Sequence, residues 1–543
     1  MIRAISSLLL IASLSASEAP LGHAKFEPSP EHPVGWRGDG TGVFPGATPS
    51  VRSWDHQSGA GILWKADVPW WSTASPIVVG DTVITTCDPH TVLAYHAVTG
   101  KLLWYNATDH LSAMMSPAKA AKVREDYAAL VKRYNEEKGS RDDKQLQKDC
   151  KRFNELGFNG IRNRAQGHTW PTPLSDGESV YVAFGCNSMA RYALADGKLI
   201  WMKQWGPIKN AGNGLKPNVT ESQTSSWAER WVPSPLLVDG LLIGYQGAVM
   251  RAADAKTGNL KWTFNLSEHI DAVWGEHDKK VRRKGPTGHW GCATPVQLDL
   301  DGVKVVVTGQ GSCIRVKDGK LLNPYVGAMA TTGGNSPVAD DKHDIVYFID
   351  RQEGGGGATT DETWAIQLTR DGDKVTGKVL WHNGTLTGNA GSPLLVNGYL
   401  YDRGLKGVDA MTGKSVFDGS GLKGVGGGYA TPNIGGKFIY TFNSNAGSVI
   451  EVAANGSLKV VGRGTLQDPD SGKSKNEKAF TRHLQYRKDL LQRAKQGVKD
   501  GIIPYIDRLP THGDFGTYGS SAFFHGDRVY VRTRLALYCL GKR

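Results

Sequence analysis

Two short stretches of similar pattern place a histidine beside a tryptophan. The first is GHTW, which contains His168, and the second is GHW, which contains His289 and Trp290. An imidazole titrates near neutral pH, so it can act as a general base or bind a metal ion. Two histidines alone are a weak metal signal, and the sequence predicts no metal site. Tyr429 and Arg351 complete the set of candidate catalytic residues.

Most of these candidates lie just before a repeated Ser-Pro or Thr-Pro motif, and the others lie in turns expected on the same side. Rings that stack, together with a few polar groups that fix orientation, would suit a small polar ligand. An alternative interpretation is that the same side chains only fill a channel. The candidate ligand-binding residues are Trp71, His168, Trp231, His289, Trp290, Asn335, Asn389, Arg351, Arg403, Tyr429 and Tyr518.

The Ser-Pro motif belongs to a unit that recurs along the whole chain. In STASPIVVGDTVITT (residues 72–86) two apolar runs flank a Gly-Asp turn, which is typical of a β-hairpin. The last copy, YGSSAFFHGDRVYVRT, lacks the proline. With the first copy, eight are present; the others begin at residues 170, 232, 292, 334, 390, 429 and 518.

A second half follows most copies, as in RAADAKTGNLKW, where a Thr-Gly-Lys-like turn joins two strands and the second strand ends in Trp262. A sheet of four strands cannot bury both faces alone, so neighbouring units must stack, and radial stacking forms a β-propeller. The eighth copy ends before its fourth strand, and GILWKADVP, with Trp64, can supply it from the N-terminus. We therefore predict an all-β, eight-bladed β-propeller of four-stranded antiparallel blades, closed by an N-terminal strand. Eight loosely related hairpins in separate domains are the alternative.

These motifs resemble the pyrroloquinoline-quinone-like (PQQ-like) repeat family of the quinoprotein alcohol dehydrogenase-like superfamily, whose blades end in A-x-D-x-x-T-G-K-x-x-W. AADAKTGNLKW (residues 252–262) and GVDAMTGK (residues 407–414) match this signature, and the resemblance covers residues 60–543. It implies the propeller fold. The family includes quinoprotein dehydrogenases, which implies PQQ with calcium as a cofactor, and a scaffold of outer-membrane protein assembly. This chain has no adjacent Cys pair and no motif matching the calcium ligands, which puts cofactor binding in doubt.

Long additions interrupt the repeat, and all of them fall in the link between the last strand of one unit and the first strand of the next. Because these links leave the same face of a propeller, the additions should cap one end of its channel. Residues 111–166 and 472–501 show apolar residues at helical spacing, and Pro117 suits a first helical position. We therefore expect α-helical insertions that cap one face.

The N-terminus has the pattern of a secretory signal peptide. Arg3 precedes an apolar run over residues 4–16, and small residues follow, so cleavage is expected after Ser17 or as late as Ala24. The predicted organisation is a signal peptide (1–24), an N-terminal extension (25–59) and the propeller (60–543). An uncleaved anchor is the alternative. We expect an exported protein, periplasmic or extracellular, with no transmembrane segment.

The formal net charge is +12, and much of the positive charge lies in the insertions, as in HDKKVRRK at residues 277–284. A basic cap could attract an anionic ligand, an acidic glycan or an envelope protein. Nucleic acid is not an expected partner of an exported propeller. We predict that the chain binds a small polar or sugar-like ligand at the capped axial face. The alternatives are a PQQ-dependent alcohol or sugar dehydrogenase and a glycan-active lyase or hydrolase.

Overall fold

The computed structural model describes most of the chain between residues 19 and 542. The segments outside the description are 137–147, 150–151, 154–155, 159–167, 206–231, 247–248, 270–271, 273–292, 329–334, 354–358, 389–390, 423, 426–430, 444–445, 467–476 and 507–519.

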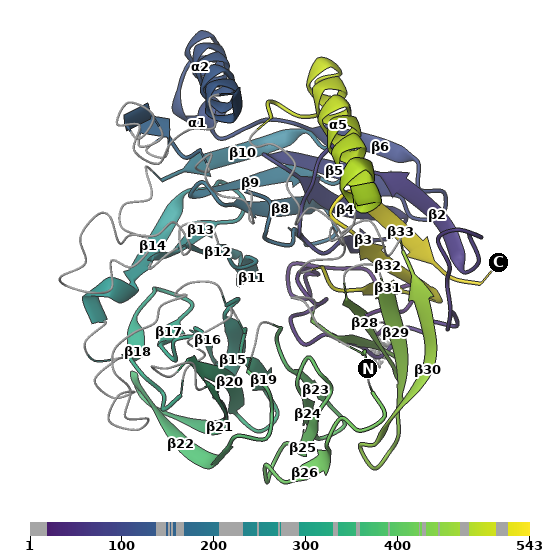
Figure 1. Cartoon of the computed structure of the whole chain (residues 1–543). Coiled ribbons are helices and arrows are strands. Elements are labelled where there is room, and N and C mark those ends of the chain that lie inside the picture. Colours follow the sequence, from purple (N-terminus) through teal and green to yellow (C-terminus); the bar gives the residue numbers. More distant parts are fainter. Residues whose placement is uncertain are drawn as a thin grey trace, which may run out of the picture.

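Eight β-sheets stand in a ring around a central axis (Figure 1). Blade 1 comprises β3 (Ile77–Val79), β4 (Thr82–Cys87), β5 (Thr91–His96) and β6 (Leu102–Asn106); blade 2 comprises β7 (Leu174–Ser175), β8 (Ser179–Phe184), β9 (Ser188–Ala193) and β10 (Leu199–Gln204). Blade 3 comprises β11 (Leu236–Val238), β12 (Leu241–Gln246), β13 (Val249–Asp254) and β14 (Leu260–Asn265); blade 4 comprises β15 (Val296–Leu300), β16 (Val303–Val307), β17 (Cys313–Arg315) and β18 (Leu321–Asn323).

The remaining blades follow the same order, and strands A to D of each blade run from the axis outward. Blade 5 comprises β19 (Val338–Asp340), β20 (Ile345–Glu353), β21 (Thr359–Asp371) and β22 (Lys374–Asn383); blade 6 comprises β23 (Leu394–Val396), β24 (Tyr399–Tyr401), β25 (Gly407–Asp409) and β26 (Ser415–Phe417). Blade 7 comprises β27 (Asn433–Gly435), β28 (Phe438–Asn443), β29 (Ala446–Val452) and β30 (Leu458–Thr465); blade 8 comprises β31 (Phe523–His525), β32 (Arg528–Arg532), β33 (Ala536–Leu540) and β2 (Ile62–Asp67). The predicted eight-bladed propeller is confirmed.

Strand β2 completes the last blade from the N-terminal side. It runs antiparallel to β33, and Trp64 lies opposite Cys539. The final sheet therefore contains residues from both ends of the propeller, as the incomplete eighth repeat predicts. We call the side of the ring that carries the D-to-A links and the B-to-C turns the link face.

A belt of hydroxyl groups joins the innermost strands around the axis. At seven of the eight blade junctions, the Ser or Thr of this motif (Ser521 in the copy that lacks the proline) uses its backbone N–H to donate a hydrogen bond to the hydroxyl of the equivalent residue in the next blade. Proline at the following position holds this residue in an extended conformation, which fixes the direction of the N–H. The bonds are Ser75 to Thr172 (3.2 Å), Thr172 to Ser234 (3.0 Å), Ser234 to Thr294 (3.2 Å), Thr294 to Ser336 (2.8 Å), Ser336 to Ser392 (3.0 Å), Ser392 to Thr431 (3.1 Å) and Ser521 to Ser75 (2.9 Å).

The junction of blades 7 and 8 is held differently. Here the amide of Asn433 donates to Ala522 O at 2.8 Å, and Arg37 of the N-terminal extension donates to Asn433 Oδ1 at 3.2 Å. Arg37 also donates to Pro393 O at 2.8 Å, and burial lowers the pKa of its guanidinium to about 9. The extension therefore supports the ring at the junction where the belt changes.

The N-terminal extension crosses the axial channel. Val34 exchanges two backbone hydrogen bonds with Ser175 of blade 2, and β1 (Val43–Phe44) pairs in parallel with the inner edge of β27 in blade 7. In Figure 1 this dark purple segment lies inside the ring. It occupies part of the axial space in which the sequence predicts a ligand.

The repeated Trp and Gly of the sequence signature meet between neighbouring blades. Gly258, in the C-to-D turn of blade 3, has φ of 70°, and a Cβ there would lie 2.7 Å from the ring of Trp201 in blade 2. Each indole N–H also donates to a carbonyl of the next blade. These bonds are Trp64 to Ala97 (2.9 Å), Trp104 to Leu194 (2.9 Å), Trp201 to Ala255 (3.0 Å), Trp262 to Val316 (2.8 Å) and Trp381 to Ala410 (2.8 Å).

The described helices belong to the insertions and stand at the outer edge of the ring in Figure 1. They are α1 (Leu111–Met114), α2 (Pro117–Glu136), α5 (Glu477–Lys499) and a 3₁₀ turn, η2 (Leu266–His269). Helix α2 begins at Pro117, as predicted, and α5 lies within the predicted segment. Among the described residues, no helix is long and apolar enough to span a bilayer.

Replacing Thr172 by Val tests the belt. The substitution keeps the side-chain shape but leaves the buried N–H of Ser75 without its acceptor, which should lower the free energy of unfolding by about 1–3 kcal/mol. Thr363→Val is the matched control, because the Thr363 hydroxyl is buried without a hydrogen-bond partner among the described residues. Denaturant unfolding compares the two. Equal stability of both variants would contradict a supporting role for the belt.

Candidate functional site

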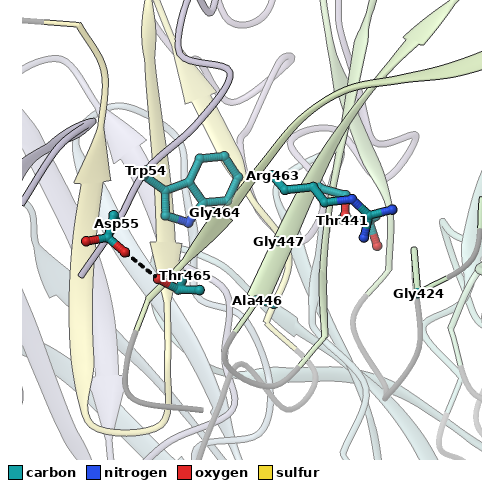
Figure 2. A pocket seen from close by; sticks show the side chains of 10 residues that line it. Trp54, Asp55, Gly424, Thr441, Ala446, Gly447, Arg463, Gly464 and Thr465 are labelled. Atoms are coloured by element: carbon teal, nitrogen blue, oxygen red, sulfur yellow. Dashed lines mark hydrogen bonds between the residues drawn. The ribbon is translucent and has the colours of Figure 1, made fainter. Parts of the chain in front are cut away.

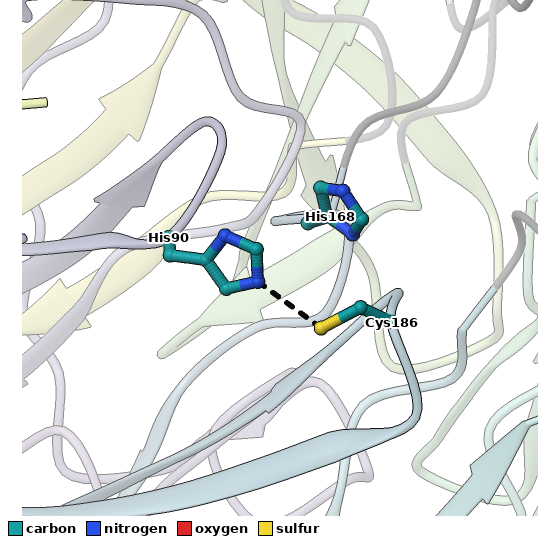
Figure 3. A group of neighbouring side chains, drawn as sticks. All are labelled: His90, His168 and Cys186. Carbon is teal, nitrogen blue, oxygen red and sulfur yellow. Dashed lines mark hydrogen bonds between the residues drawn. The ribbon is translucent and has the colours of Figure 1, made fainter. Parts of the chain in front are cut away.

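A cluster of histidines and one cysteine lies on the link face, at the junction of blades 1 and 2 (Figure 3). His90 lies in the turn between β4 and β5, His168 in the link before β7, and Cys186 in the turn between β8 and β9. All three side chains are fully buried. Because short connections between paired strands hold these residues, their relative positions are well constrained.

The side chains of the cluster are in direct contact. His90 Nε2 lies 3.1 Å from Cys186 Sγ, and the hydroxyl of Ser188 lies 2.9 Å from the same sulfur. The rings of His90 and His168 are 4.7 Å apart between centroids. One side-chain donor atom from each of His90, His168 and Cys186 lies within 4.8 Å of the other two.

The first insertion adds a third imidazole to this cluster. His110 Nε2 donates to Leu156 O at 2.8 Å, since a carbonyl oxygen can only accept, and its ring centroid lies 4.8 Å from that of His90. The adjacent carboxylate of Asp109 is buried and accepts two hydrogen bonds of 2.7 Å from Arg124 of α2. This ion pair fixes α2 against the segment that carries His110.

The cluster is electrically neutral. Burial is the main cause that lowers the pKa of His90, His110 and His168, and the neighbouring imidazoles lower the pKa of His90 further. Burial also raises the pKa of the Cys186 thiol to about 12. Neutral imidazoles offer ring-nitrogen lone pairs, which are the groups that bind a metal ion.

A second group of polar residues connects this cluster to blade 8. The backbone N–H of Thr169, next to His168, donates to Asp88 Oδ1 at 2.9 Å, and Ser72 Oγ donates to Thr169 O at 2.8 Å. Trp71 is 1% exposed, and the guanidinium of Arg534 lies 5.8 Å from the centroid of its ring. Trp71 and His168, both predicted from the sequence, therefore lie in neighbouring positions tied by Asp88 and Thr169.

A pocket of about 420 Å³ opens on the link face over blade 7 (Figure 2). Its wall includes Trp54 from the N-terminal extension, Arg463 and Thr465 from the end of β30, and Thr441 from β28. The carboxylate of Asp55 lies 3.3 Å from the Thr465 hydroxyl that donates to it. Glycines at 424, 447 and 464 form part of the lining and leave room between the side chains.

Two buried polar atoms in the pocket wall lack a hydrogen-bond partner among the described residues. They are the indole Nε1 of Trp54 and the hydroxyl of Thr441, and both side chains are 2% exposed. Most buried polar groups in proteins are hydrogen-bonded, so each such atom marks a place for a bound group or an ordered water. The pocket thus offers a donor and a hydroxyl next to a guanidinium and a carboxylate.

The structure describes five of the sequence-predicted site residues. Trp71, His168 and Asn335 are buried on the link face, where Asn335 Oδ1 accepts from Gly391 N at 2.9 Å. Arg403 lies in the turn after β24. Arg351 lies in β20, and only the backbone of Arg351 is described. The predicted residues outside the described part of the chain are Trp231, His289, Trp290, Asn389, Tyr429 and Tyr518.

Sequence analysis missed His90, His110 and Cys186. No short motif joins them, because they come from a turn, an insertion and a turn of the next blade. The available signal was the repeat itself: His90 and Cys186 occupy equivalent B-to-C turns of adjacent blades, which face the link before β7. Trp54 and Arg463 were missed because the N-terminal extension was not expected to reach blade 7.

The described residues do not fit a quinone cofactor. A stacking site needs an open aromatic face, and the predicted stacking residue Trp71 is buried against Arg534. Cys87, Cys186, Cys313 and Cys539 are all free thiols, each on a different blade. We therefore derive no step through PQQ.

The Asp109–Arg124 pair predicts a measurable contribution to stability. Arg124→Met leaves the buried Asp109 carboxylate without its partner and should lower the free energy of unfolding by about 2 kcal/mol, less than for a fully buried pair because Arg124 is partly exposed. Lys122→Met on the same helix is the control, since its pairs with Glu125 and Asp126 are exposed and should contribute at most about 0.5 kcal/mol. Denaturant unfolding measures both. A larger loss in the Lys122 variant would contradict the assignment.

Comparison with known proteins supports the fold. A family model described as outer membrane protein assembly factor BamB matches residues 10–140. No curated protein sequence matches the chain. BamB from Moraxella catarrhalis aligns over 89% of this chain and 97% of its own, with 10% identity and a TM-score of 0.44. Quinohemoprotein alcohol dehydrogenase from Comamonas testosteroni aligns over 94% and 81%, with 12% identity and a TM-score of 0.42.

These TM-scores are below 0.5, so neither alignment transfers a ligand, an activity or a partner to this chain. The family match is informative because it covers blade 1, where the turn at Gly100 packs against Trp64 and Trp104 packs on the next blade. The same contact between a turn glycine and a closing tryptophan recurs at successive blade junctions, and together with the family match over residues 10–140 it supports a PQQ-like repeat β-propeller.

Proposed function

We propose that this protein is an exported binding propeller for a small polar, sugar-like ligand, held in the pocket over blade 7 on the link face. The observation that carries the proposal is the pair of orphaned polar atoms, Trp54 Nε1 and Thr441 Oγ, in the wall of a pocket of about 420 Å³. A pocket of this size is within the range of small-molecule sites. The sequence analysis expected the ligand in the axial space of the capped face, and that expectation stays a prediction; the site that we propose here is the pocket over blade 7.

The chemistry of the lining favours a polyhydroxylated ligand. Asp55 has acceptor oxygens, Arg463 has N–H donors, and the hydroxyls of Thr441 and Thr465 can donate or accept a hydrogen bond. The indole of Trp54 adds an apolar edge, and apolar edges beside hydroxyls suit a sugar ring, which is polar at its rim. Among the described lining residues, Asp55 is the one carboxylate and Arg463 the one cation, and the remaining polar side chains are hydroxyls and an indole, which together suit the binding of a polar ligand.

If the chain is exported as we propose, the packing of the first described residues distinguishes between the two expected cleavage positions. Leu21 O accepts from Gly46 N at 2.9 Å, and Gly22 O accepts from Gly526 N at 2.8 Å. Cleavage after Ala24 would remove both contacts, whereas cleavage after Ser17 keeps them. A signal peptide of 17 residues is therefore the version that agrees with the folded structure.

The mature N-terminus checks this proposal. The protein recovered from the periplasm or medium of an expressing bacterium should begin at Glu18, as determined by N-terminal sequencing and intact mass. Full-length protein retained in the cytoplasm would contradict export, and a mature chain beginning at Lys25 would contradict the role of Leu21 and Gly22 in the fold.

Ligand binding is tested by calorimetric titration of the mature protein with glucose, galactose, glucuronic acid and their disaccharides. Thr441→Val should weaken the binding of the best ligand about tenfold, the equivalent of one hydrogen bond. Its free energy of unfolding should stay within about 0.5 kcal/mol of the native value, because the hydroxyl has no partner to lose among the described residues.

Thr363→Val is again the matched control, because its buried hydroxyl lies in blade 5, away from the pocket. It should bind the ligand as the native protein does. Equal affinity of the Thr441 variant, or no binding of any saccharide, would refute the proposed site. Appearance of an oxidised or unsaturated sugar during the titration would replace binding by the dehydrogenase or the lyase alternative.

A further inference from the structure

We propose that His90, His168 and Cys186 form a closed binding site for a d¹⁰ metal ion, Zn²⁺ or Cu⁺. This site is separate from the pocket over blade 7 and does not depend on it. The donor atoms of the three side chains lie within 4.8 Å of one another, and His90 Nε2 and Cys186 Sγ are 3.1 Å apart. Ligands bound to one zinc ion at about 2.0–2.3 Å lie roughly 3–4 Å from each other, so small ring rotations suffice.

The type of donor selects the metal. Two imidazole nitrogens and one sulfur form a soft to borderline set, which Zn²⁺ and Cu⁺ prefer. Ca²⁺ and Mg²⁺ require oxygen ligands, and none of the three side chains supplies one. An imidazole binds a metal ion through the lone pair of an unprotonated ring nitrogen.

An unsatisfied nitrogen points independently to a missing group. The Nδ1 atom of His110 is buried and has no hydrogen-bond partner among the described residues, while its Nε2 donates to Leu156 O. A buried imidazole nitrogen that bonds to nothing is rare, so an ion or a water is expected to complete it. His110 lies against His90 and 6.0 Å from His168 between centroids, so it is the described side chain best placed to add a fourth nitrogen.

The surroundings favour a structural rather than a catalytic ion. All four side chains are fully buried, and zinc sites that act in structure have every position filled by the protein. Ser188 Oγ, 2.9 Å from the Cys186 sulfur, can donate to the thiolate that the metal requires. Since His90 belongs to blade 1 and Cys186 to blade 2, the ion would fasten two blades and the insertion between them.

The test uses the full mature chain, produced with added zinc or, anaerobically, with added Cu⁺, then dialysed against a weak chelator. We expect one equivalent of one of these metals by elemental analysis, and a higher melting temperature than that of protein stripped with a strong chelator. Replacement by Co²⁺ should give an intense sulfur-to-cobalt absorption, a signature that packing alone does not produce. The metal retained at one equivalent distinguishes Zn²⁺ from Cu⁺.

Two variants and one control complete the test. Cys186→Ser and His168→Gln should each lose stoichiometric metal and the cobalt absorption, whereas Cys313→Ser should keep both. Cys313 is an equally buried thiol, and within the described part of the chain it belongs to no such cluster. No bound metal in the native protein, or a full equivalent in the Cys186 variant, would overturn the proposal and leave a metal-free hydrogen bond between His90 and Cys186. The saccharide titration of the native protein tests the pocket over blade 7 separately, so failure of one proposal does not decide the other.

Discussion

The hydroxyl belt around the axis is the constraint on which the rest of the ring depends. The buried N–H of a belt residue finds its acceptor in the neighbouring blade, so that polar group of one blade is satisfied only when the next blade is present. A buried donor without an acceptor costs more than an ordinary hydrogen bond gains, and the belt therefore links the stability of each blade to the presence of the next. At the outer edge, the closing tryptophan of one blade packs on the turn glycine of the next, so its apolar surface is also buried only when the next blade is present.

The two candidate sites lie where regular blades meet additional segments of the chain. At the junction of blades 7 and 8, Asn433 and Arg37 replace a belt hydroxyl, and the same N-terminal extension goes on to form the wall of the pocket with Trp54. At the junction of blades 1 and 2, an insertion brings His110 to the turns that hold His90 and Cys186. The regular blades hold these segments at fixed positions.

The sequence predicted the architecture because the repeat encodes local and short-range contacts. The Thr-Gly-Lys turn was expected to join two strands, and the segment with Trp64 was expected to supply the missing strand of the eighth unit; both features are confirmed. The residues of the candidate sites were harder to predict from the sequence, because they come together only when the blades close into a ring. His168 was identified by its neighbouring motif, but its partners come from other connections, and the role of the serine before each proline was not recognised.

The closure of blade 8 by β2 has a consequence for the order of events in the cell. Strand β2 leaves the ribosome long before its partner β33. Contacts between residues so far apart in the chain form slowly, because the intervening loop must be ordered before they can contribute. The ring can therefore close only once β33 has been made. Until then β2 has no partner strand, so blade 8 is the last blade that can be completed.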